Sequence, residues 1–272
     1  MIVSCLMGGL GNQMFQYSVA RRLALKHGTK VKIDLAWLET EGKKADAIRV
    51  YELGAFKIEA GFYKPKLFSK PRLVHENQFK FDPTVLELPD NVLLQGYWQS
   101  YKYFEDQADQ IRKDFTFKTV AEGVNAKILK EIKQTTAVSI HIRRGDYLTS
   151  KASSQFHGTQ SLEYYRTAVG ELTKKVKSPH FFVFSDEPAW CKQNLKFDFP
   201  TTYAENNSAN SGHEDMRLMS ACQHHILANS SFSWWGAWLN PNPSKLVIAP
   251  KLWFRDKSID TSDLMPEGWI RL

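Results

Sequence analysis

Three short apolar runs in the second half of the chain each end in polar residues that could bind a nucleoside diphosphate. The runs are residues 137–142, 181–184 and 225–228. The polar residues that follow them include Arg143, Arg144 and Asp146, then Asp186, then Ser230, Ser231 and Ser233, with Phe232 between the last two serines. Arginine forks bind a diphosphate, hydroxyls and helix N–H groups add anion contacts, and a carboxylate can accept a hydrogen bond from a purine edge. Because ligands of parallel α/β sheets bind beyond the carboxyl ends of the strands, the pattern predicts a nucleotide-sugar enzyme.

The segment from His141 to Asp146 carries most of this prediction. Alternation along a strand sends His141 and Arg143 to one face of a sheet and Ile142 and Arg144 to the other. One arginine can therefore point into the ligand crevice while the other braces the loop, and the spacing leaves open which does which. Asp146 is either a general base that takes a proton from an attacking hydroxyl group or a salt-bridge partner of the arginines. A surface salt-bridge cluster is the alternative to a binding site.

The other polar clusters also have a structural alternative. Ser185 and the two acids after it could be only a helix N-cap with a favourable first turn, and the tryptophans after Ser233 could be core packing. Both clusters gain functional weight from following strands of the same predicted sheet as the arginines.

A glycine-rich turn lies near the N-terminus, at residues 8–11, and resembles a dinucleotide fingerprint. It follows a strand, opens a helix and precedes Asp34, which has the place of a ribose-binding acid. Methionine at position 14 stands where the third small residue of the fingerprint should allow close packing, which argues against an NAD-dependent oxidoreductase. The amides of Asn12 and Gln13, at the front of the helix, could instead reach a ligand.

The order of elements predicts an α/β protein. Strands at 2–7 and 31–34 flank a helix from Asn12 to Lys26, residues 40–100 are less regular, and a helix is expected over 100–115. After a boundary within 115–125, strands and helices alternate: strands at 137–142, 181–184, 201–203, 225–228 and 246–249, and helices at 161–176, 187–195, 213–222 and 232–239. We therefore expect two Rossmann-like domains facing across a cleft, 1–120 and 121–272.

Composition narrows the classes of function. The net charge is +7, but the lysines are scattered, which favours a solvated basic surface over a nucleic-acid-binding module. Three distant cysteines fit a reducing compartment, and no apolar run approaches the ~20 residues of a membrane span, so we expect a cytoplasmic protein, with at most peripheral membrane contact. The histidines near Glu214 and at 224–225 lack metal-site spacing, so no metal is expected.

Taken together, the motifs resemble the α-1,2-fucosyltransferase family, glycosyltransferase family 11, in its bacterial form. The matching stretches are GGLGNQMFQYSVARRLA at 8–24, HIRRGDY at 141–147, FSDEP at 184–188, HEDMRLMSACQHHILANSSFSWWGAWL at 213–239, and the Pro-Glu-Gly-Trp-Ile ending at 266–270. The resemblance covers essentially the whole chain.

The resemblance implies a GT-B architecture and metal-independent transfer of L-fucose, with inversion, from GDP-β-L-fucose to the 2-hydroxyl of a terminal galactoside. The acceptor would bind on the side of residues 1–120 and the donor on residues 121–272. Among the donor-binding residues, Arg143 would contact the β-phosphate and His141 and Asp186 the guanine, with residues 231–233 around the diphosphate. The stretch after the arginines, 147–151, offers no acid at the place where α-1,6 relatives carry their base.

Overall fold

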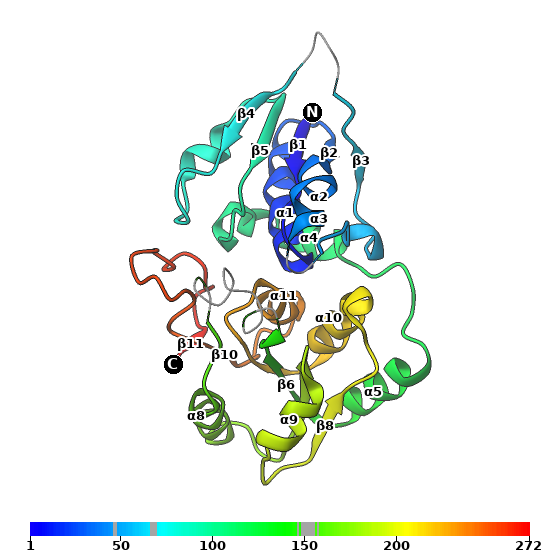
Figure 1. The fold of residues 1–272 in the computed structure, drawn as a ribbon, viewed down its shortest axis with the longest axis vertical. Coiled ribbons are helices and arrows are strands. Elements are labelled where there is room, and N and C mark those ends of the chain that lie inside the picture. Colours follow the sequence, from blue (N-terminus) through cyan, green and yellow to red (C-terminus); the bar gives the residue numbers. More distant parts are fainter. Residues whose placement is uncertain (46–47, 66–69, 146, 148–155, 157) are drawn as a thin grey trace. The chain divides into compact units, whose positions relative to one another are not determined.

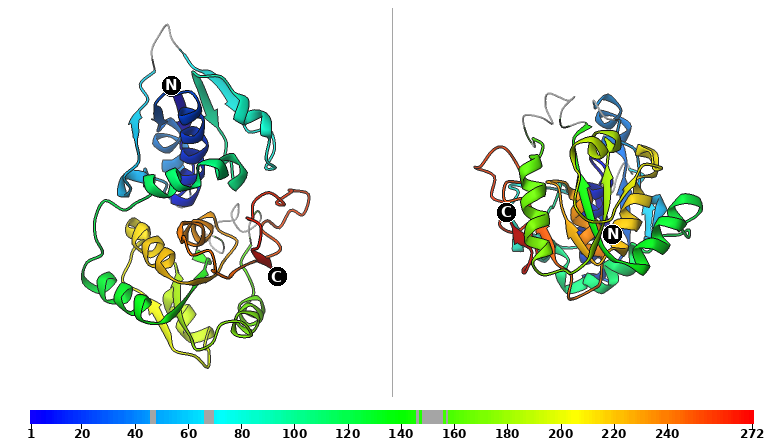
Figure 2. Two further views of the ribbon diagram at one scale, coloured as in Figure 1. Left: turned by 180° about the vertical axis from the view of Figure 1, so that it is seen from behind. Right: turned by 90° about the horizontal axis from the view of Figure 1, so that it is seen from below.

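The computed structural model describes residues 1–272 except 46–47, 66–69, 146, 148–155 and 157. The chain forms two compact units (Figures 1 and 2): Met1–Thr119 with Ile259–Pro266, and Val120–Ser258 with Glu267–Leu272. Residues 259–266 join the first unit because the Ser100 hydroxyl donates to the Asp263 backbone oxygen (2.8 Å) and Lys102 pairs with the Asp263 carboxylate.

The first unit is a parallel sheet of five strands in the order β3-β2-β1-β5-β4. Its elements are β1 (Ile2–Cys5), α1 (Leu10–Lys26), β2 (Val31–Asp34), α2 (Ala36–Glu39), α3 (Glu41–Lys44), β3 (Ala60–Phe62), β4 (Arg72–His75), β5 (Val92–Gln95) and α4 (Ala108–Asp114). The helix expected over 100–115 is wrong in its first half. Residues 101–107 form two 3₁₀ turns instead, the first capped by the Ser100 hydroxyl, and the α-helix begins at Ala108.

Helix α1 is buried on almost every side, and its buried residues include polar as well as apolar side chains. Its buried polar side chains are paired. The Gln16 amide accepts from the Met7 N–H and donates to the Gly96 carbonyl, and Arg21 donates to Asp114, which also accepts from the Tyr17 hydroxyl. Paired in this way, the polar groups escape the desolvation cost of an unmade hydrogen bond.

The second unit is a parallel six-stranded sheet in the order β11-β10-β9-β6-β7-β8. Its elements are α5 (Gly123–Gln134), β6 (Thr136–Ile142), α8 (Leu162–Thr173), β7 (Pro179–Ser185), α9 (Pro188–Asn194), β8 (Thr201–Ala204), α10 (Gly212–Ala221), β9 (His224–Ile226), α11 (Ser231–Leu239), β10 (Val247–Ala249) and β11 (Ile270–Arg271). Read from the opposite edge, the strands have the Rossmann order 3-2-1-4-5-6, and the predicted Rossmann-like fold of this half is confirmed.

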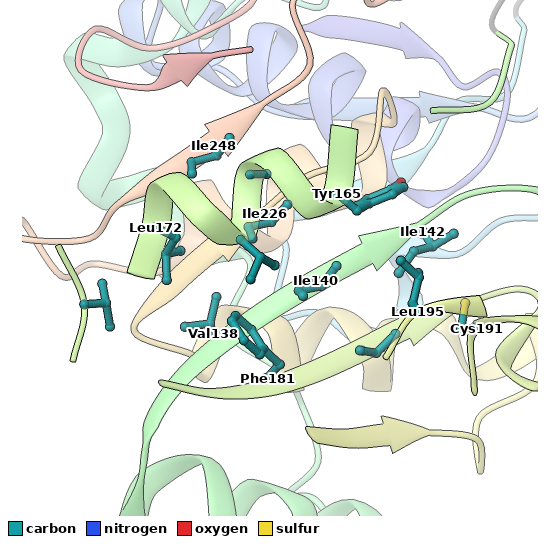
Figure 3. Packing of buried hydrophobic residues seen from close by; sticks show 14 residues of the cluster. Val138, Ile140, Ile142, Tyr165, Leu172, Phe181, Cys191, Leu195, Ile226 and Ile248 are labelled. Atoms are coloured by element: carbon teal, nitrogen blue, oxygen red, sulfur yellow. The ribbon is translucent and has the colours of Figure 1, made fainter. Parts of the chain in front are cut away.

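Alternate residues of β6 and β7 build two different cores. Val138, Ile140 and Ile142 pack with Phe181 under α8 and α9 (Figure 3). The intervening residues face α5 and α10, where Ala137, Phe182 and Phe184 meet side chains of both helices. Each fully buried large apolar side chain of this kind contributes roughly 1.5–3 kcal/mol to folding. The sheet is therefore covered on both faces, which leaves its carboxyl edge as the place for a ligand.

Helices α10 and α11 pack closely at Gly236. A Cβ added there would lie 2.6 Å from the Met219 Cε and 3.0 Å from its Cβ. We expect Gly236→Ala to lower the free energy of unfolding by roughly 1–3 kcal/mol, because overpacking outweighs the gain in helix propensity. The matched control is Gly170→Ala in α8, where an added Cβ meets no atom within 4 Å. Chemical denaturation should show a loss only for Gly236→Ala, and equal stability of the two variants would contradict the packing argument.

No helix in the described part of the chain has both the length and the apolar character that crossing a membrane requires.

Candidate functional site

The candidate site lies at the carboxyl edge of the second sheet, where its strand order changes direction. From β6 the chain continues to β7 and β8 on one side and later to β9, β10 and β11 on the other. The loop after β6 carries the two arginines, and the segment after β9 leads into α11. The Tyr147 hydroxyl joins them by donating to the Asn229 backbone oxygen (3.1 Å). Such a switch point is where α/β sheets bind their ligands.

The structure separates the two arginines as alternation along the strand predicts. Arg144 goes to the face of α8 and α9, where its Nε donates to the Glu187 Oε2 (2.9 Å) and its guanidinium lies 3.5 Å above the Trp190 ring. An arginine that is both stacked and paired is held in one geometry. Arg144 is therefore the arginine that braces the loop.

Arg143 lies on the other side of the strand. Its Nη1 is 3.2 Å from the Asp186 Oδ2, and its guanidinium lies 5.7 Å from the centre of the Tyr147 ring. The side chain is 27% exposed, whereas that of Arg144 is 19% exposed. A guanidinium has five N–H donors, so this ion pair leaves it the capacity to bind an anion as well.

Asp186 binds the backbone of the loop that follows β6 and carries Arg143 and Arg144, here called the arginine loop. Its Oδ1 accepts from the Arg144 N–H and its Oδ2 from the Gly145 N–H, both at 3.0 Å, in addition to the ion pair with Arg143. Both carboxylate oxygens thus serve the loop, which is the bracing function that the sequence offered to Asp146. Asp146 itself lies outside the described residues.

His141 is a buried, neutral histidine. Burial, together with the neighbouring charge of Arg143, lowers its pKa to about 3. Its ring lies 5.4 Å from the Phe232 ring, and its Nδ1 has no hydrogen-bond partner among the described residues. At pH 7 the side chain can therefore offer one donor and one acceptor but no charge.

The hydroxyls at 230–233 divide between helix capping and the ligand edge. The Ser230 Oγ accepts from the Phe232 N–H (3.3 Å) as the N-cap of α11, and the Ser233 hydroxyl donates back to the Ala228 and Ser230 carbonyls. Ser231 is the first residue of the helix and is half-buried. The positive end of a nine-residue helix therefore adjoins the arginine loop's strand, as anion binding requires.

Asn12 and Gln13 belong to the first unit. The Gln13 amide donates to the Gly8 (3.0 Å) and Val50 (2.7 Å) carbonyls and accepts from the Glu52 N–H (2.9 Å). These bonds use both amide protons of Gln13, so its observed function is to fasten the 50–52 segment to α1. Asn12 accepts from the Gln99 Nε2 at 2.8 Å.

The histidine pair at 224–225 is structural. His225 donates from Nδ1 to the Ser139 hydroxyl (2.8 Å) because its Nε2 accepts from the Asn240 amide (2.9 Å), and His224 accepts from the Leu246 N–H. Within the described ranges, no group of three or more His, Cys, Asp or Glu side chains could hold a metal ion.

The sequence did not single out several residues that shape this site. Trp190 supplies the ring under Arg144 and Tyr147 the link between the loops, and neither belongs to a pattern that identifies such a partner from sequence. The sequence offers one clue, which concerns Trp190. It follows Glu187 by three residues, about one helical turn, so the two side chains lie on the same face of the helix.

Asp215 in α10 belongs to the 213–215 cluster that the sequence analysis rejected as a metal site, and its carboxyl group has a shifted pKa. Burial raises its pKa to about 6, and the nearby Glu214 also raises it, while a 2.6 Å hydrogen bond from the Asn207 amide acts in the opposite direction. Above pH 6 the folded protein therefore carries an ionised carboxylate in a poorly solvated place.

We expect Asp215→Asn to stabilise the protein at neutral pH by on the order of 1–3 kcal/mol. The folded-state pKa is raised, so the wild-type group loses stability as the pH rises from about 4 to 6. The difference in unfolding free energy between variant and wild type should thus be near zero at pH 4 and constant above pH 7. Denaturation at several pH values checks this, and a pH-independent difference would show that Asp215 does not titrate as described.

Comparison with known proteins places this geometry in a family. The family model described as glycosyl transferase family 11 matches residues 4–272. Two Escherichia coli proteins are each 32% identical to the chain: an alpha-1,2-colitosyltransferase (100% of this chain and 98% of that protein) and the O-antigen biosynthesis glycosyltransferase WbnK (99% of each). The human galactoside alpha-(1,2)-fucosyltransferase 1 is 25% identical over 85% of this chain and 63% of its own length.

Among solved structures, the NodZ alpha-1,6-fucosyltransferase soaked with GDP-fucose superposes with a TM-score of 0.51 at 13% identity, covering 88% of this chain and 92% of that one. A likeness at this identity concerns the fold. The expected GT-B class, with two parallel-sheet α/β units, is confirmed.

Proposed function

Since the chain belongs to glycosyl transferase family 11, we propose that it transfers L-fucose, with inversion, from GDP-β-L-fucose to the 2-hydroxyl of a terminal galactoside. The observation that carries the proposal is that two neighbouring strands at the switch point of the second sheet, β6 and β9, lead at their carboxyl ends to Arg143 and to the N-terminus of α11. Both are suited to the diphosphate of such a donor.

In this reaction the bond between the sugar C1 and the β-phosphate oxygen breaks while the acceptor O2 bonds to C1 from the opposite side. Negative charge then accumulates on the departing GDP. Arg143 would stabilise that charge, together with two groups of α11: the N–H groups of its first turn and the Ser231 hydroxyl. We propose that this stabilisation suffices without a metal ion, so that transfer persists in EDTA. His141 would bind the guanine by hydrogen bonding alone.

Asp186 supports this chemistry in a different way from the one that its place in the motif implied. Its two oxygens hold the N–H groups of Arg144 and Gly145, so we assign it the positioning of the arginine loop, with direct guanine contact as the alternative. The proton of the acceptor hydroxyl needs a base. For Asp146 the two roles, base or loop salt bridge, both remain proposals.

Asp146→Asn separates those roles. A catalytic Asp146 predicts that the transfer rate falls while GDP affinity and melting temperature hold, because only the proton acceptor is lost. A bracing Asp146 predicts that all three fall together. An unchanged rate, affinity and melting temperature would remove Asp146 from both roles.

Thermal shift with GDP, NAD and an oligonucleotide tests the function class directly. We expect stabilisation by GDP, followed by formation of an α-1,2-fucoside when GDP-fucose and a terminal galactoside are supplied. Stabilisation by NAD alone would favour the oxidoreductase alternative, and salt-dependent oligonucleotide binding would favour a nucleic-acid-binding protein. Loss of transfer in EDTA with recovery in Mn²⁺ would overturn metal independence.

The colitosyltransferase among the relatives makes GDP-colitose the second candidate donor. Colitose is fucose without its 3-hydroxyl, so both sugars could fit one pocket. Parallel kcat/KM measurements with the two donors decide between them, and we expect GDP-fucose to give the higher value.

The net charge of +7 leads us to propose, in addition, loose contact with an anionic membrane surface that carries the acceptor. The chain should then sediment with anionic vesicles at low salt and be released at high salt. Absence of binding at low salt would remove this part of the proposal.

A further inference from the structure

A strained turn follows strand β5 of the first unit, at residues 96–99. The order β3-β2-β1-β5-β4 places β2 and β3 on one side of β1, and β5 and β4 on the other. The turns after β1 and β5 therefore meet at the carboxyl edge where the order changes direction. This edge is the general ligand-binding place of an open parallel sheet. The Gln99 Nε2 joins the two turns through its hydrogen bond to the Asn12 Oδ1 (2.8 Å).

Trp98 has a φ of +55°. For a bulky residue this left-handed conformation is an outlier that costs on the order of 1–3 kcal/mol and persists only where the surroundings impose it. Such strain is concentrated at ligand-binding and catalytic sites. The strain at Trp98 is therefore the first sign that the turn has a function beyond connecting two elements.

Glu76, just after β4, imposes the conformation. Its Oε2 accepts from the Tyr97 N–H (2.7 Å) and its Oε1 from the Trp98 N–H (2.9 Å). The fit excludes any side chain at Gly96, where an added Cβ would lie 2.3 Å from the Glu76 Cβ. Burial raises the pKa of the Glu76 carboxyl, against the effect of the two N–H groups. The poorly solvated Glu76 carboxylate thus accepts hydrogen bonds from two successive backbone N–H groups of one turn.

Two side chains of the turn carry buried polar atoms that the described residues leave without hydrogen bonds. They are the Trp98 Nε1 and the Gln99 Oε1, in side chains 1% and 7% exposed. Buried polar atoms are paired in the great majority of cases, so two adjacent exceptions indicate a missing partner. One is a donor and the other an acceptor, and neither is charged at any ordinary pH.

Tyr97 lies between these features and is the exposed member of the turn, at 38%. Burial raises the pKa of its hydroxyl, and the positive charge of Arg49 acts in the opposite direction. Arg49 also approaches the glycine-rich turn: a Cβ at Gly9 would lie 3.3 Å from the Arg49 Nη1. An exposed aromatic ring beside neutral donors and acceptors suits a polyhydroxylated, uncharged ligand, whose ring has an apolar face and whose edge carries hydroxyls.

We propose that the turn at 96–99 binds the galactoside acceptor, with the Tyr97 ring packed against the apolar face of the sugar. The indole Nε1–H of Trp98 and the side-chain Oε1 of Gln99 supply a donor and an acceptor for its hydroxyls. Glu76 is the positioning residue that holds the turn in its left-handed conformation. The inference rests on the proposed function, because it presupposes that the chain has a sugar acceptor.

The test is Tyr97→Ala, with steady-state rates measured separately against acceptor and GDP-fucose. Loss of the stacked ring should raise the acceptor KM about tenfold, in keeping with ~1.4 kcal/mol per factor of ten. The donor KM, the hydrolysis of GDP-fucose in the absence of acceptor, and the melting temperature should stay as in the wild type. Tyr97→Phe keeps the ring and should stay within about twofold of wild type. Leu73→Ala, at a 50% exposed position of β4, is the matched control and should change nothing.

Glu76→Gln tests the positioning role. The amide can accept only one of the two N–H groups, so we expect the acceptor KM to rise and the melting temperature to fall, with donor hydrolysis unchanged. An equal rise of the donor KM would indicate a merely structural role.

An unchanged acceptor KM in Tyr97→Ala overturns the inference while leaving the proposed function intact. An equal effect of Leu73→Ala does the same. Absence of transfer by the unaltered protein to any terminal galactoside would instead overturn the proposed function, and the inference with it.

Discussion

Arg143→Ala should lower the rate of fucosyl transfer by roughly 10²–10³, the typical effect of removing one contact to the charge of a transition state. The guanidinium follows β6, and the N-terminus of α11 follows the neighbouring strand β9. The departing diphosphate needs a positive charge most when the C1–O bond is broken. Stability should change by less than about 1 kcal/mol, because the Arg143–Asp186 ion pair is partly exposed and Asp186 keeps its two backbone partners.

Rates with saturating GDP-fucose, GDP affinity by calorimetry and melting temperature together check this prediction. Arg143→Lys keeps the charge but loses the planar fork, so we expect an intermediate rate. The matched control is Arg166→Ala, an exposed arginine of α8 on the same unit, which should leave the rate unchanged. Full activity of Arg143→Ala, or an equal loss in Arg166→Ala, would contradict the assignment.

Asp186→Asn should have the second largest effect, lowering both GDP affinity and the transfer rate by about 10–100-fold. An asparagine amide replaces one accepting oxygen by an NH₂ group, which would face the N–H of Arg144 or Gly145 instead of accepting from it. Both N–H groups are partly exposed, so the loss of one acceptor costs less than the roughly 1–3 kcal/mol of a buried N–H, and the melting temperature should fall slightly. The arginine loop would then no longer hold Arg143 in place.

The combination of readouts distinguishes two roles for Asp186. A fall in rate, affinity and melting temperature together supports positioning of the loop. A fall in GDP affinity with an unchanged melting temperature would show direct contact with the guanine instead. The matched control is Asp198→Asn, an exposed aspartate after α9, for which no change is expected.

The sequence by itself determined the class of the fold and the strands that carry the site. After residue 120, apolar runs of four to six residues alternate with helical patterns. Continuous apolar runs are typical of strands buried on both faces, and such strands occur in parallel sheets. Two-residue periodicity also separated Arg143 from Arg144, and the structure confirms that separation because side chains of a strand must alternate between faces.

Elements that depend on non-local contacts could not be predicted from the sequence. The strands β3, β4 and β5 are only three or four residues long and lie within the stretch 40–100 that looked irregular. They form because distant strands supply hydrogen-bonding partners: β2 for β3, β1 for β5, and β5 in turn for β4. No local sequence pattern reveals these partners. The same holds for residues 259–266, which join the first unit through Ser100 and Lys102.

Tertiary structure alone decided what each polar residue does. Gln13 and Asp186 are of residue types that often bind ligands. In the folded chain, however, their side chains form hydrogen bonds with backbone groups that are distant in sequence. Glu76 carried no motif, and its importance comes from two N–H groups about twenty residues later in the chain. A hydrogen bond depends on distance and direction in space, so residue type and spacing can nominate polar side chains, but only the folded chain shows which of them its own backbone has already engaged.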